Sequence, residues 1–225
     1  MENSRDKKLL DLVRKEYQQF NEHSHGWDHI QRVIKNCTII NRDGKADVTI
    51  LYPACLLHDL GRMDGTEEDH SNSIKKSEKL LIQSGYTEIE RKKIIDCILC
   101  HSVNSQKKPV TIEEKILFDA DKLDSYGHIG VTRFFTLAGE QKWSLQESVD
   151  TAFERITKLS DIGGFYTKEA ERIGLSKAKR AFVFYYYLFK EMGDEEKIIA
   201  LDKMVTEKYG KIKGRIILSI FKYRF

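Results

Sequence analysis

Proline is almost absent from this chain, which has only two prolines, Pro53 and Pro109, in 225 residues. Because a proline inside a helix removes a hydrogen bond and clashes with the preceding turn, its absence leaves long stretches free to be helical. Apolar residues recur in those stretches at helical spacing. The two clearest stripes are Leu9, Leu10, Val13, Tyr17 and Phe20, and Ile30, Val33, Ile34, Cys37 and Ile40. The sequence therefore predicts an all-α fold, a bundle of about nine or ten helices.

Helix starts are marked by the capping-box pattern, in which Glu follows a Ser or Thr by three residues. Pro53 fits the first turn of a helix over "YPACLLHDLG", with Gly61 as its stop. The three capping-box matches are Thr87 with Glu90, Thr111 with Glu114, and Ser144 with Glu147.

The segment "KLSDIGGFYTKE" is the best candidate for a loop between a helical core, residues 1–160, and a C-terminal helical extension, residues 161–225, although both could form a single domain.

Positive and negative charges nearly cancel, with 38 Lys and Arg residues against 35 Asp and Glu residues. Nucleic-acid-binding proteins usually carry a clear excess of positive charge, so we expect no nucleic-acid partner. The segment "MENSRDKKLLDLVRKEYQQF" lacks the apolar core of a signal peptide, and no apolar run approaches the roughly 20 residues of a membrane span. We therefore expect a cytoplasmic protein without membrane contact, in which cysteines stay reduced.

The segment "CILCH" has the Cys-x-x-Cys-His pattern of c-type haem attachment, and its cysteines could also be a redox pair or half of a zinc site. Haem attachment normally follows export, for which we see no signal, and a zinc ribbon needs a second pair, whereas Cys37 and Cys55 stand alone. Cys97 and Cys100 alternate with isoleucine and leucine, as small core residues do. We therefore predict that both pack in the core and that His101 has a separate role.

Histidine and aspartate gather at four places, "HSHGWDHIQRV", "LLHDLGR", "CHS" and "LFDADKLDSYG". In the first, His25 and His29 share one face if the helix already runs there. In the second, His58 and Asp59 follow an apolar helix, and burying them without partners would cost several kcal/mol. A metal ion or a dense hydrogen-bond network would remove that cost, although each cluster taken alone could also be a helix cap or a surface group.

The order H…HD…D, with these segments around it, resembles the HD superfamily of metal-dependent phosphohydrolases. It is most similar to the small bacterial HD hydrolases that include nucleoside triphosphate pyrophosphohydrolases. The resemblance spans about residues 20–140 and continues more weakly through "GFYTKEAERIG". It implies an HD-domain helical core that holds one divalent ion, which could be Mn, Co, Ni, Fe, Zn or Mg. The metal ligands that it implies are His29, His58, Asp59 and Asp121.

The same resemblance implies a nucleotide substrate, whose phosphates need positive charge nearby. Arg32 is the first candidate because it lies in the family's "HxxRV" pattern, and an arginine offers a planar fork to phosphate oxygens. Arg62 follows the HD pair and Lys122 follows Asp121. Either of these two could equally be a solvated surface cation.

Proton transfer and a second ion involve a further set of residues. His101 and Asp124 are candidates for handling a proton, and Asp124 could instead orient a ligand or cap a helix. In two-metal members of the superfamily, two extra histidines help to hold a second ion, and His70 and His101 lie in the corresponding interval. If only one ion binds, either histidine could contact substrate phosphate or transfer a proton.

The implied reaction is the attack of a metal-activated water on a phosphorus atom of a nucleotide. We predict a nucleoside triphosphate pyrophosphohydrolase, which cuts between the α- and β-phosphates. The alternatives are a 5'-nucleotidase or a phosphodiesterase of the same fold, and a metal-holding module that binds a ligand without turnover.

Two apolar segments remain near the C-terminus. From Lys203 onward, basic residues outnumber acidic ones and alternate with apolar residues, as at a membrane-surface or nucleic-acid contact. We prefer a last helix that packs on the bundle, or across a homodimer. The segment "FVFYYYLF", residues 182–189, is read as core or interface in the same way.

Cys97 and Cys100 should be dispensable for chemistry, because packing alone explains their spacing. Replacing both with Ala or Ser should leave the specific activity of the folded protein near that of the unchanged chain. Circular dichroism and metal content serve as the controls. A loss of activity while both controls stay normal would assign the pair a chemical role.

Overall fold

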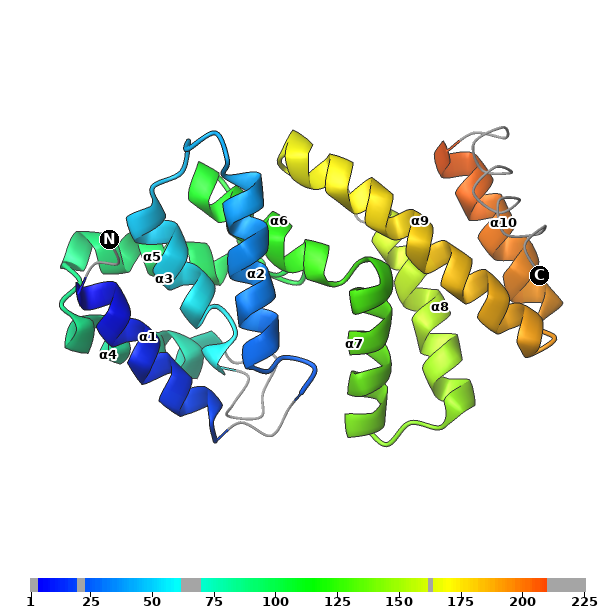
Figure 1. Cartoon of the computed structure of the whole chain (residues 1–225), viewed down its shortest axis with the longest axis horizontal. Helices are drawn as coiled ribbons and strands as arrows, with labels where there is room; N and C mark the ends of the chain where they lie inside the picture. The colour runs from blue at the N-terminus through cyan, green and yellow to red at the C-terminus, as the bar shows by residue number, and fades with distance from the viewer. Residues whose placement is uncertain (1–3, 20–22, 62–69, 162–163, 210–225) are drawn as a thin grey trace. The chain divides into compact units, whose positions relative to one another are not determined.

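The computed structural model describes residues 4–19, 23–61, 70–161 and 164–209 of the chain. The regular secondary structure in these ranges consists of ten α-helices, with a short 3₁₀ turn after the third and no strand (Figure 1). The predicted all-α fold is therefore confirmed. None of the helices in these ranges combines the length and the apolar composition that crossing a membrane requires.

The chain divides into two compact units. The first contains Met1–Asp124 with Tyr166–Ala170, and the second contains Ser125–Phe165 with Glu171–Phe225. The helices of the first unit are α1 (Ser4–Tyr17), α2 (Trp27–Ile40), α3 (Val48–Leu57), α4 (His70–Ser84), α5 (Glu88–Leu99) and α6 (Ile112–Asp124). The later helices are α7 (Gly127–Glu140), α8 (Leu145–Asp161), α9 (Lys168–Glu191, whose first residues belong to the first unit) and α10 (Glu195–Tyr209).

This division differs from the one that the sequence suggests. The predicted boundary at residue 160 falls in the last turn of α8, and the compact units separate at Ser125 instead. The boundary at 160 stays a prediction about independently folding domains.

The core of the first unit is built around α3, which is apolar on every side and buried along most of its length. Helix α2 is amphipathic and turns Ile30, Val33 and Cys37 inward. It packs along α6 and against α3, while α5 covers another side of α3. The start of α2, the end of α3 and the end of α6 are consequently held in one packed assembly.

Pro53 lies inside α3, so its predicted place in the first turn was wrong. The helix begins earlier because Asp47 caps it, with an Oδ1 that accepts a hydrogen bond from the backbone N–H of Thr49 at 2.9 Å. The proline removes one internal hydrogen bond, but burial of the apolar residues around it keeps the helix intact. Helix α3 ends at Leu57, before Gly61, which leaves His58 and Asp59 in the turn that follows.

All three predicted capping boxes form. In each, the carboxylate accepts from the backbone N–H of the cap residue, and the cap hydroxyl accepts from the backbone N–H of the glutamate. The cap N–H to carboxylate distances are 2.8 Å for Thr87 and Glu90, 3.0 Å for Thr111 and Glu114, and 2.7 Å for Ser144 and Glu147.

The cysteines are core residues, as predicted for the "CILCH" pair. Cys97 and Cys100 are buried at the end of α5, and burial raises the pKa of both thiols, to about 12 for Cys100. Cys37 and Cys55 are remote in sequence, yet their Sγ atoms lie 3.1 Å apart between α2 and α3. Burial also raises the pKa of Cys37 well above its ordinary value. Thiols in such surroundings are poor nucleophiles.

The second unit has an apolar core of its own. Phe182, Tyr185 and Phe189, from the aromatic segment of α9, lie in this core with Val149 of α8 and Leu201 of α10. The core interpretation of "FVFYYYLF" is therefore confirmed. Most of the basic C-terminal segment lies outside the described residues.

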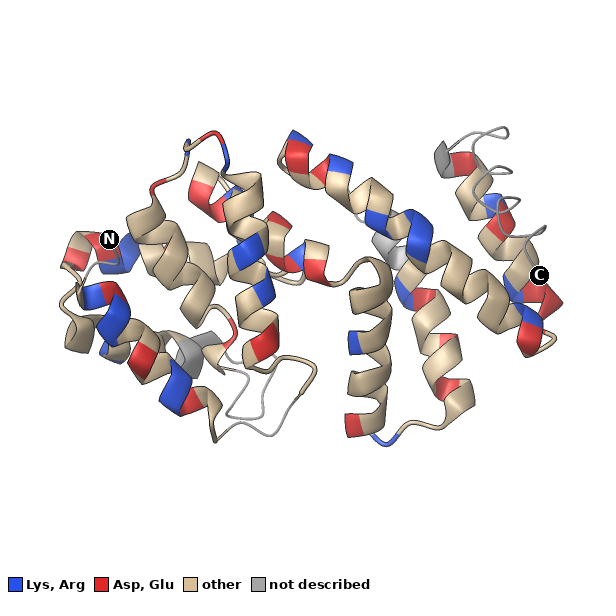
Figure 2. Cartoon of the chain, viewed as in Figure 1, with Lys and Arg blue, Asp and Glu red and all other residues tan. Residues whose placement is uncertain are grey.

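Charged residues of both signs are interspersed along helices such as α1 and α9 (Figure 2). Some of them fasten α1 to the rest of the first unit. Arg5 forms an ion pair with Glu90, with 2.7 Å between Nη2 and Oε1, and Asp6 accepts a hydrogen bond of 2.6 Å from the hydroxyl of Tyr86. These contacts tie α1 to the start of α5.

Asp119 anchors the returning segment of the first unit. Its buried carboxylate accepts three hydrogen bonds, from the N–H of Tyr166 at 2.9 Å, the N–H of Thr167 at 2.7 Å and the hydroxyl of Thr167 at 2.7 Å. Burial raises the pKa of Asp119, although these bonds act in the opposite direction. The carboxylate caps the approach to α9 and fixes α6, the helix that also carries Asp121.

Replacing Asp119 with Ala should lower the free energy of unfolding by about 3 kcal/mol, because two backbone N–H groups lose their acceptor. Thr167→Val removes the hydroxyl contact with Asp119 and also the 3.3 Å hydrogen bond that this hydroxyl accepts from the N–H of Ala170, so it should cost about 2 kcal/mol. Urea denaturation followed by circular dichroism measures both values. Asp43→Ala, at an exposed position, is the matched control. Equal stabilities of Asp119→Ala and this control would contradict the anchoring role.

Candidate metal centre

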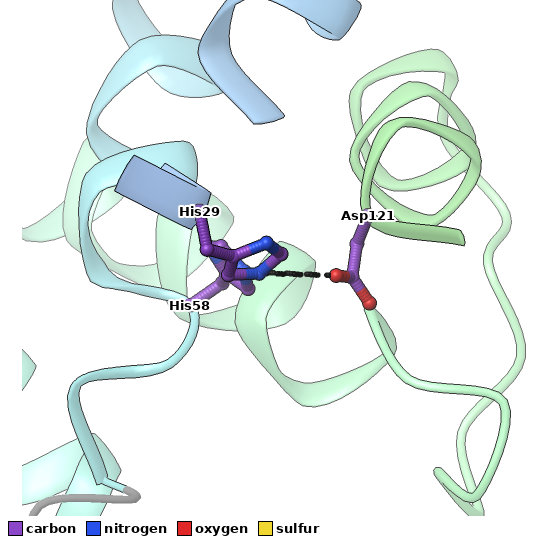
Figure 3. Close-up of side chains that lie close together, drawn as sticks. All are labelled: His29, His58 and Asp121. Carbon is purple, nitrogen blue, oxygen red and sulfur yellow. Dashed lines mark hydrogen bonds and ion pairs between the residues drawn. The ribbon is translucent and has the colours of Figure 1, made fainter. Parts of the chain in front are cut away.

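Three helices bring the four predicted metal ligands to one place. His29 lies in the first turn of α2, His58 and Asp59 directly follow α3, and Asp121 lies near the end of α6. The side chains of His29, His58 and Asp121 point toward one another (Figure 3). Because α2, α3 and α6 pack together in the first unit, residues up to 92 positions apart in sequence become neighbours.

The ring nitrogens and carboxylate oxygens lie within a few ångströms of each other. The Nε2 atom of His29 is 3.2 Å from Nε2 of His58, 3.3 Å from Oδ2 of Asp59 and 3.3 Å from Oδ1 of Asp121. The Nε2 atom of His58 is 3.6 Å from Asp59 and 4.0 Å from Asp121. Both imidazoles and Asp59 are buried, whereas the side chain of Asp121 is 25% exposed, so the cluster is most open to solvent beside Asp121.

The contacts of the two Nδ1 atoms, which face away from the centre, indicate the tautomers of His29 and His58. Nδ1 of His29 is 2.8 Å from Oδ2 of Asp124, and Nδ1 of His58 is 2.8 Å from the backbone carbonyl of Cys55. A carbonyl and a carboxylate only accept hydrogen bonds, so each Nδ1 carries the proton. In the neutral rings, each Nε2 therefore turns a lone pair toward the centre.

The charge states strengthen this interpretation. Burial lowers the pKa of His58 to about 4, so its ring is neutral near pH 7. The pKa of Asp121 stays below its ordinary value although burial acts to raise it, so Asp121 is a carboxylate near pH 7. Two lone pairs and two carboxylates thus face one another in a mostly buried space. A cation among them would remove the cost of this arrangement.

The donor set fits a divalent transition metal. Two imidazole nitrogens and two carboxylates suit Mn, Co, Ni, Fe or Zn, and suit Mg less well. The partners on the two Nδ1 atoms are of the kind that orients metal-binding histidines in other proteins. The assignment of His29, His58, Asp59 and Asp121 as ligands stays a prediction, which this arrangement supports.

His101 borders the cluster from the end of α5. Its Nε2 is 3.6 Å from Oδ1 of Asp59, its Nδ1 is 2.6 Å from the carbonyl of Ile98, and its ring centre is 5.1 Å from that of His58. Burial lowers the pKa of His101, but the hydrogen bond and charge of Asp59 more than offset burial and raise it. His101 therefore lies beside His58 and Asp59, while its role stays a prediction.

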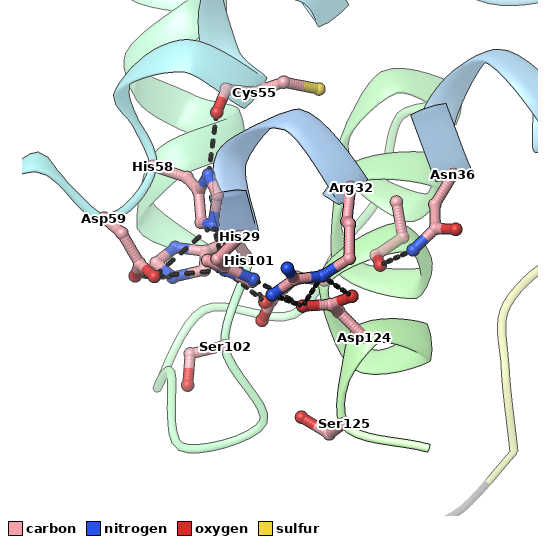
Figure 4. A network of polar contacts seen from close by, with 12 residues as sticks. His29, Arg32, Asn36, Cys55, His58, Asp59, His101, Ser102, Asp124 and Ser125 are labelled. Atoms are coloured by element: carbon pink, nitrogen blue, oxygen red, sulfur yellow. Dashed lines mark hydrogen bonds and ion pairs between the residues drawn. The ribbon is translucent and has the colours of Figure 1, made fainter. Parts of the chain in front are cut away.

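Arg32 and Asp124 are brought to each other as well as to the cluster (Figure 4). The Nε atom of Arg32 is 2.8 Å from Oδ1 and 3.1 Å from Oδ2 of Asp124, and its Nη2 is 3.0 Å from Oδ2. The same Oδ2 accepts the hydrogen bond from His29. The two residues predicted for phosphate binding and proton transfer thus form one ion pair behind a predicted ligand.

The remaining predicted residues are less informative. Lys122 is buried, and its Nζ lies 5.6 Å from the ring centre of Phe118, in the preceding turn of α6. That burial disfavours the surface-cation interpretation of Lys122. Arg62 lies outside the described residues. His70 begins α4, but its side chain is not among those described, so the second ion stays a prediction.

One hydrogen-bond acceptor at the candidate metal centre could not be predicted from the sequence. The carbonyl of Cys55 orients the ring of His58, and every residue has a carbonyl. Only the path of the backbone through the last turn of α3 selects this one.

Comparison with known proteins supports the family resemblance. The family model "HD domain" matches residues 26–126, a range that contains all four predicted ligands. The protein YpgQ of Bacillus subtilis strain 168, which is described as uncharacterised, is 30% identical over 147 residues, covering 61% of this chain and 71% of YpgQ.

Solved structures share the fold. The crystal structure of Bacillus subtilis YpgQ in complex with ADP superposes with a TM-score of 0.66 at 24% identity, covering 82% of this chain and 98% of that one. The Lin1889 protein of Listeria innocua gives a TM-score of 0.64 at 25% identity, covering 85% and 99%. An HD-superfamily hydrolase of Bacillus thuringiensis gives 0.65 at 24% identity, covering 86% and 100%.

Removing either a predicted histidine ligand or a predicted aspartate ligand should remove most of the bound metal. The chain purified without chelator should hold about one divalent ion, and His58→Ala and Asp121→Ala should each lose most of it, because the site keeps too few donors. Elemental analysis measures the metal content. His128→Ala, which alters an exposed histidine of α7, is the matched control and should keep the metal. Full metal content in both site variants would show that the ligand set is wrong.

Proposed function

We propose that this chain, which belongs to the HD superfamily of metal-dependent phosphohydrolases, hydrolyses a phosphate bond of a nucleotide. The observation that carries the proposal is the convergence of His29, His58, Asp59 and Asp121, with both Nε2 lone pairs turned inward. A divalent ion held there would supply an activated water and would polarise a phosphoryl group. The protein holds the imidazoles in the tautomer that such an ion requires.

A nucleotide is the substrate class that we favour. The YpgQ protein of Bacillus subtilis has been solved with ADP, which supports nucleotide binding by this related chain. We further propose that the substrate is a nucleoside triphosphate cut between its α- and β-phosphates. Attack at the α-phosphorus requires that this group lie at the more open side of the centre, beside Asp121, with the other phosphates extending outward.

His101 is our candidate for handling a proton. It lies beside the HD pair, with its Nε2 3.6 Å from Asp59, while its Nδ1 is engaged by a backbone carbonyl. The ring is therefore held with Nε2 toward the centre, where it could serve a reacting oxygen. The cytoplasmic location and the homodimer stay predictions.

A panel of ribo- and deoxyribonucleotides with Mn, Co, Ni and Mg tests the reaction, with products resolved by chromatography. We expect pyrophosphate and a monophosphate from triphosphates. Asp121→Ala should lose this turnover, whereas Asp43→Ala, at an exposed site, should keep it.

The other outcomes each overturn part of the proposal. Orthophosphate from monophosphates would indicate a nucleotidase, and cleavage of cyclic or linear diesters would indicate a phosphodiesterase. No turnover with any metal, by protein shown to hold one, would indicate a ligand-binding module without catalysis.

A further inference from the structure

We infer that Asp124 and Arg32 are positioning residues that together hold His29 for metal binding. Of the roles that the sequence left open for Asp124, this selects the orientation of a ligand over proton transfer, and it replaces the phosphate-binding role predicted for Arg32. The inference rests on the proposed function only in that the centre binds a divalent ion. It concerns which residues fix the orientation and the tautomer of the His29 ring.

The carboxylate of Asp124 is already engaged on both oxygens. Oδ2 accepts from Nδ1 of His29 at 2.8 Å and from Nη2 of Arg32 at 3.0 Å, and Oδ1 accepts from Nε of Arg32 at 2.8 Å. The residue is buried. A general base needs an oxygen that can reach a reacting proton. Asp124 instead lies on the far side of the imidazole from the inward-facing Nε2.

The contact with His29 sets the tautomer of the ring. Because the carboxylate accepts from Nδ1, the proton stays on that nitrogen, and Nε2 keeps its lone pair for an ion. The same contact fixes the rotation of the ring. A carboxylate partner of this kind also raises the basicity of a metal-binding imidazole.

Arg32 acts on the carboxylate. Its guanidinium lies alongside Asp124, with Nε and Nη2 directed at the two oxygens, so the plane of the carboxylate is fixed (Figure 4). It also balances charge. Asp59 and Asp121 already place two carboxylates at the centre, and without this cation the buried Asp124 would add a third, unpaired negative charge beside them.

Two helices, α2 and α6, each supply one predicted metal ligand and one positioning residue. His29 and Arg32 are three residues apart on α2, and Asp121 and Asp124 are three residues apart on α6. On each helix, one turn therefore presents a predicted ligand and the next presents a positioning residue. Because α2 packs along α6, the ion pair spans the interface that brings His29 to Asp121.

The test measures the affinity for Mn²⁺ and Co²⁺ by isothermal titration, with the metal-depleted full chain. Asp124→Asn keeps the shape of the side chain but loses its charge, and it should weaken binding by about 10- to 100-fold. Arg32→Gln should weaken binding as well. The double variant should bind no more weakly than Asp124→Asn, because Arg32 acts through Asp124. The visible spectrum of bound Co²⁺ should change in the same variants.

The matched controls are Arg42→Gln and Asp43→Asn, whose side chains are 66% and 64% exposed. Both should bind the ions with unchanged affinity. If Asp124→Asn fails to fold, Arg32→Gln decides the question, because its side chain is 32% exposed and its replacement disturbs the core less.

Two results would overturn the inference while leaving the proposed function intact. In the first, Arg32→Gln binds metal normally but raises the KM for the nucleotide, which would make Arg32 a phosphate ligand. In the second, Asp124→Asn binds metal normally but loses kcat at saturating metal, which would make Asp124 a proton carrier. If the unchanged chain binds neither ion, the proposed function fails, and this inference fails with it.

Discussion

Two imidazole lone pairs and two carboxylates face one another in the first unit, and the rest of that unit can be understood as the means of holding them there. Nε2 of His29 lies 3.2 Å from Nε2 of His58, and both Nδ1 atoms donate elsewhere. Groups that repel one another are kept together only by packing or by a cation. Here the packing comes from α2, α3 and α6, and the donor set suits a divalent ion.

The helices around the centre are fixed by different physical means. Helix α3 is held by burial along most of its length, which allows it to continue through Pro53 and to end beside the cluster. Helix α6 begins at the Thr111 capping box and is anchored near its end by Asp119, which binds the segment before α9. Local capping thus determines where α6 begins, whereas tertiary contacts determine the position of the ends of α3 and α6 that carry the predicted ligands.

Most of the helical architecture could be predicted from the sequence, because stripes and capping boxes act within a few residues of one another. The three capping boxes formed, and the buried faces of α1 and α2 follow their apolar stripes. The start of α3 could not be read in this way. Burial of the apolar residues around Pro53 stabilises the helix although the proline removes a hydrogen bond from its interior. Asp47 caps the helix at an earlier position than the proline indicates.

The helical fold, the types of donor at the centre and the family of the chain can all be read from the sequence. Which groups each donor contacts depends on how the helices pack against one another. His29 and Asp124 are 95 residues apart, so no local spacing predicts that one orients the other, or that Arg32 turns to that carboxylate. Spacing along a helix shows which residues share a face, whereas the packing of a second helix decides what that face contacts.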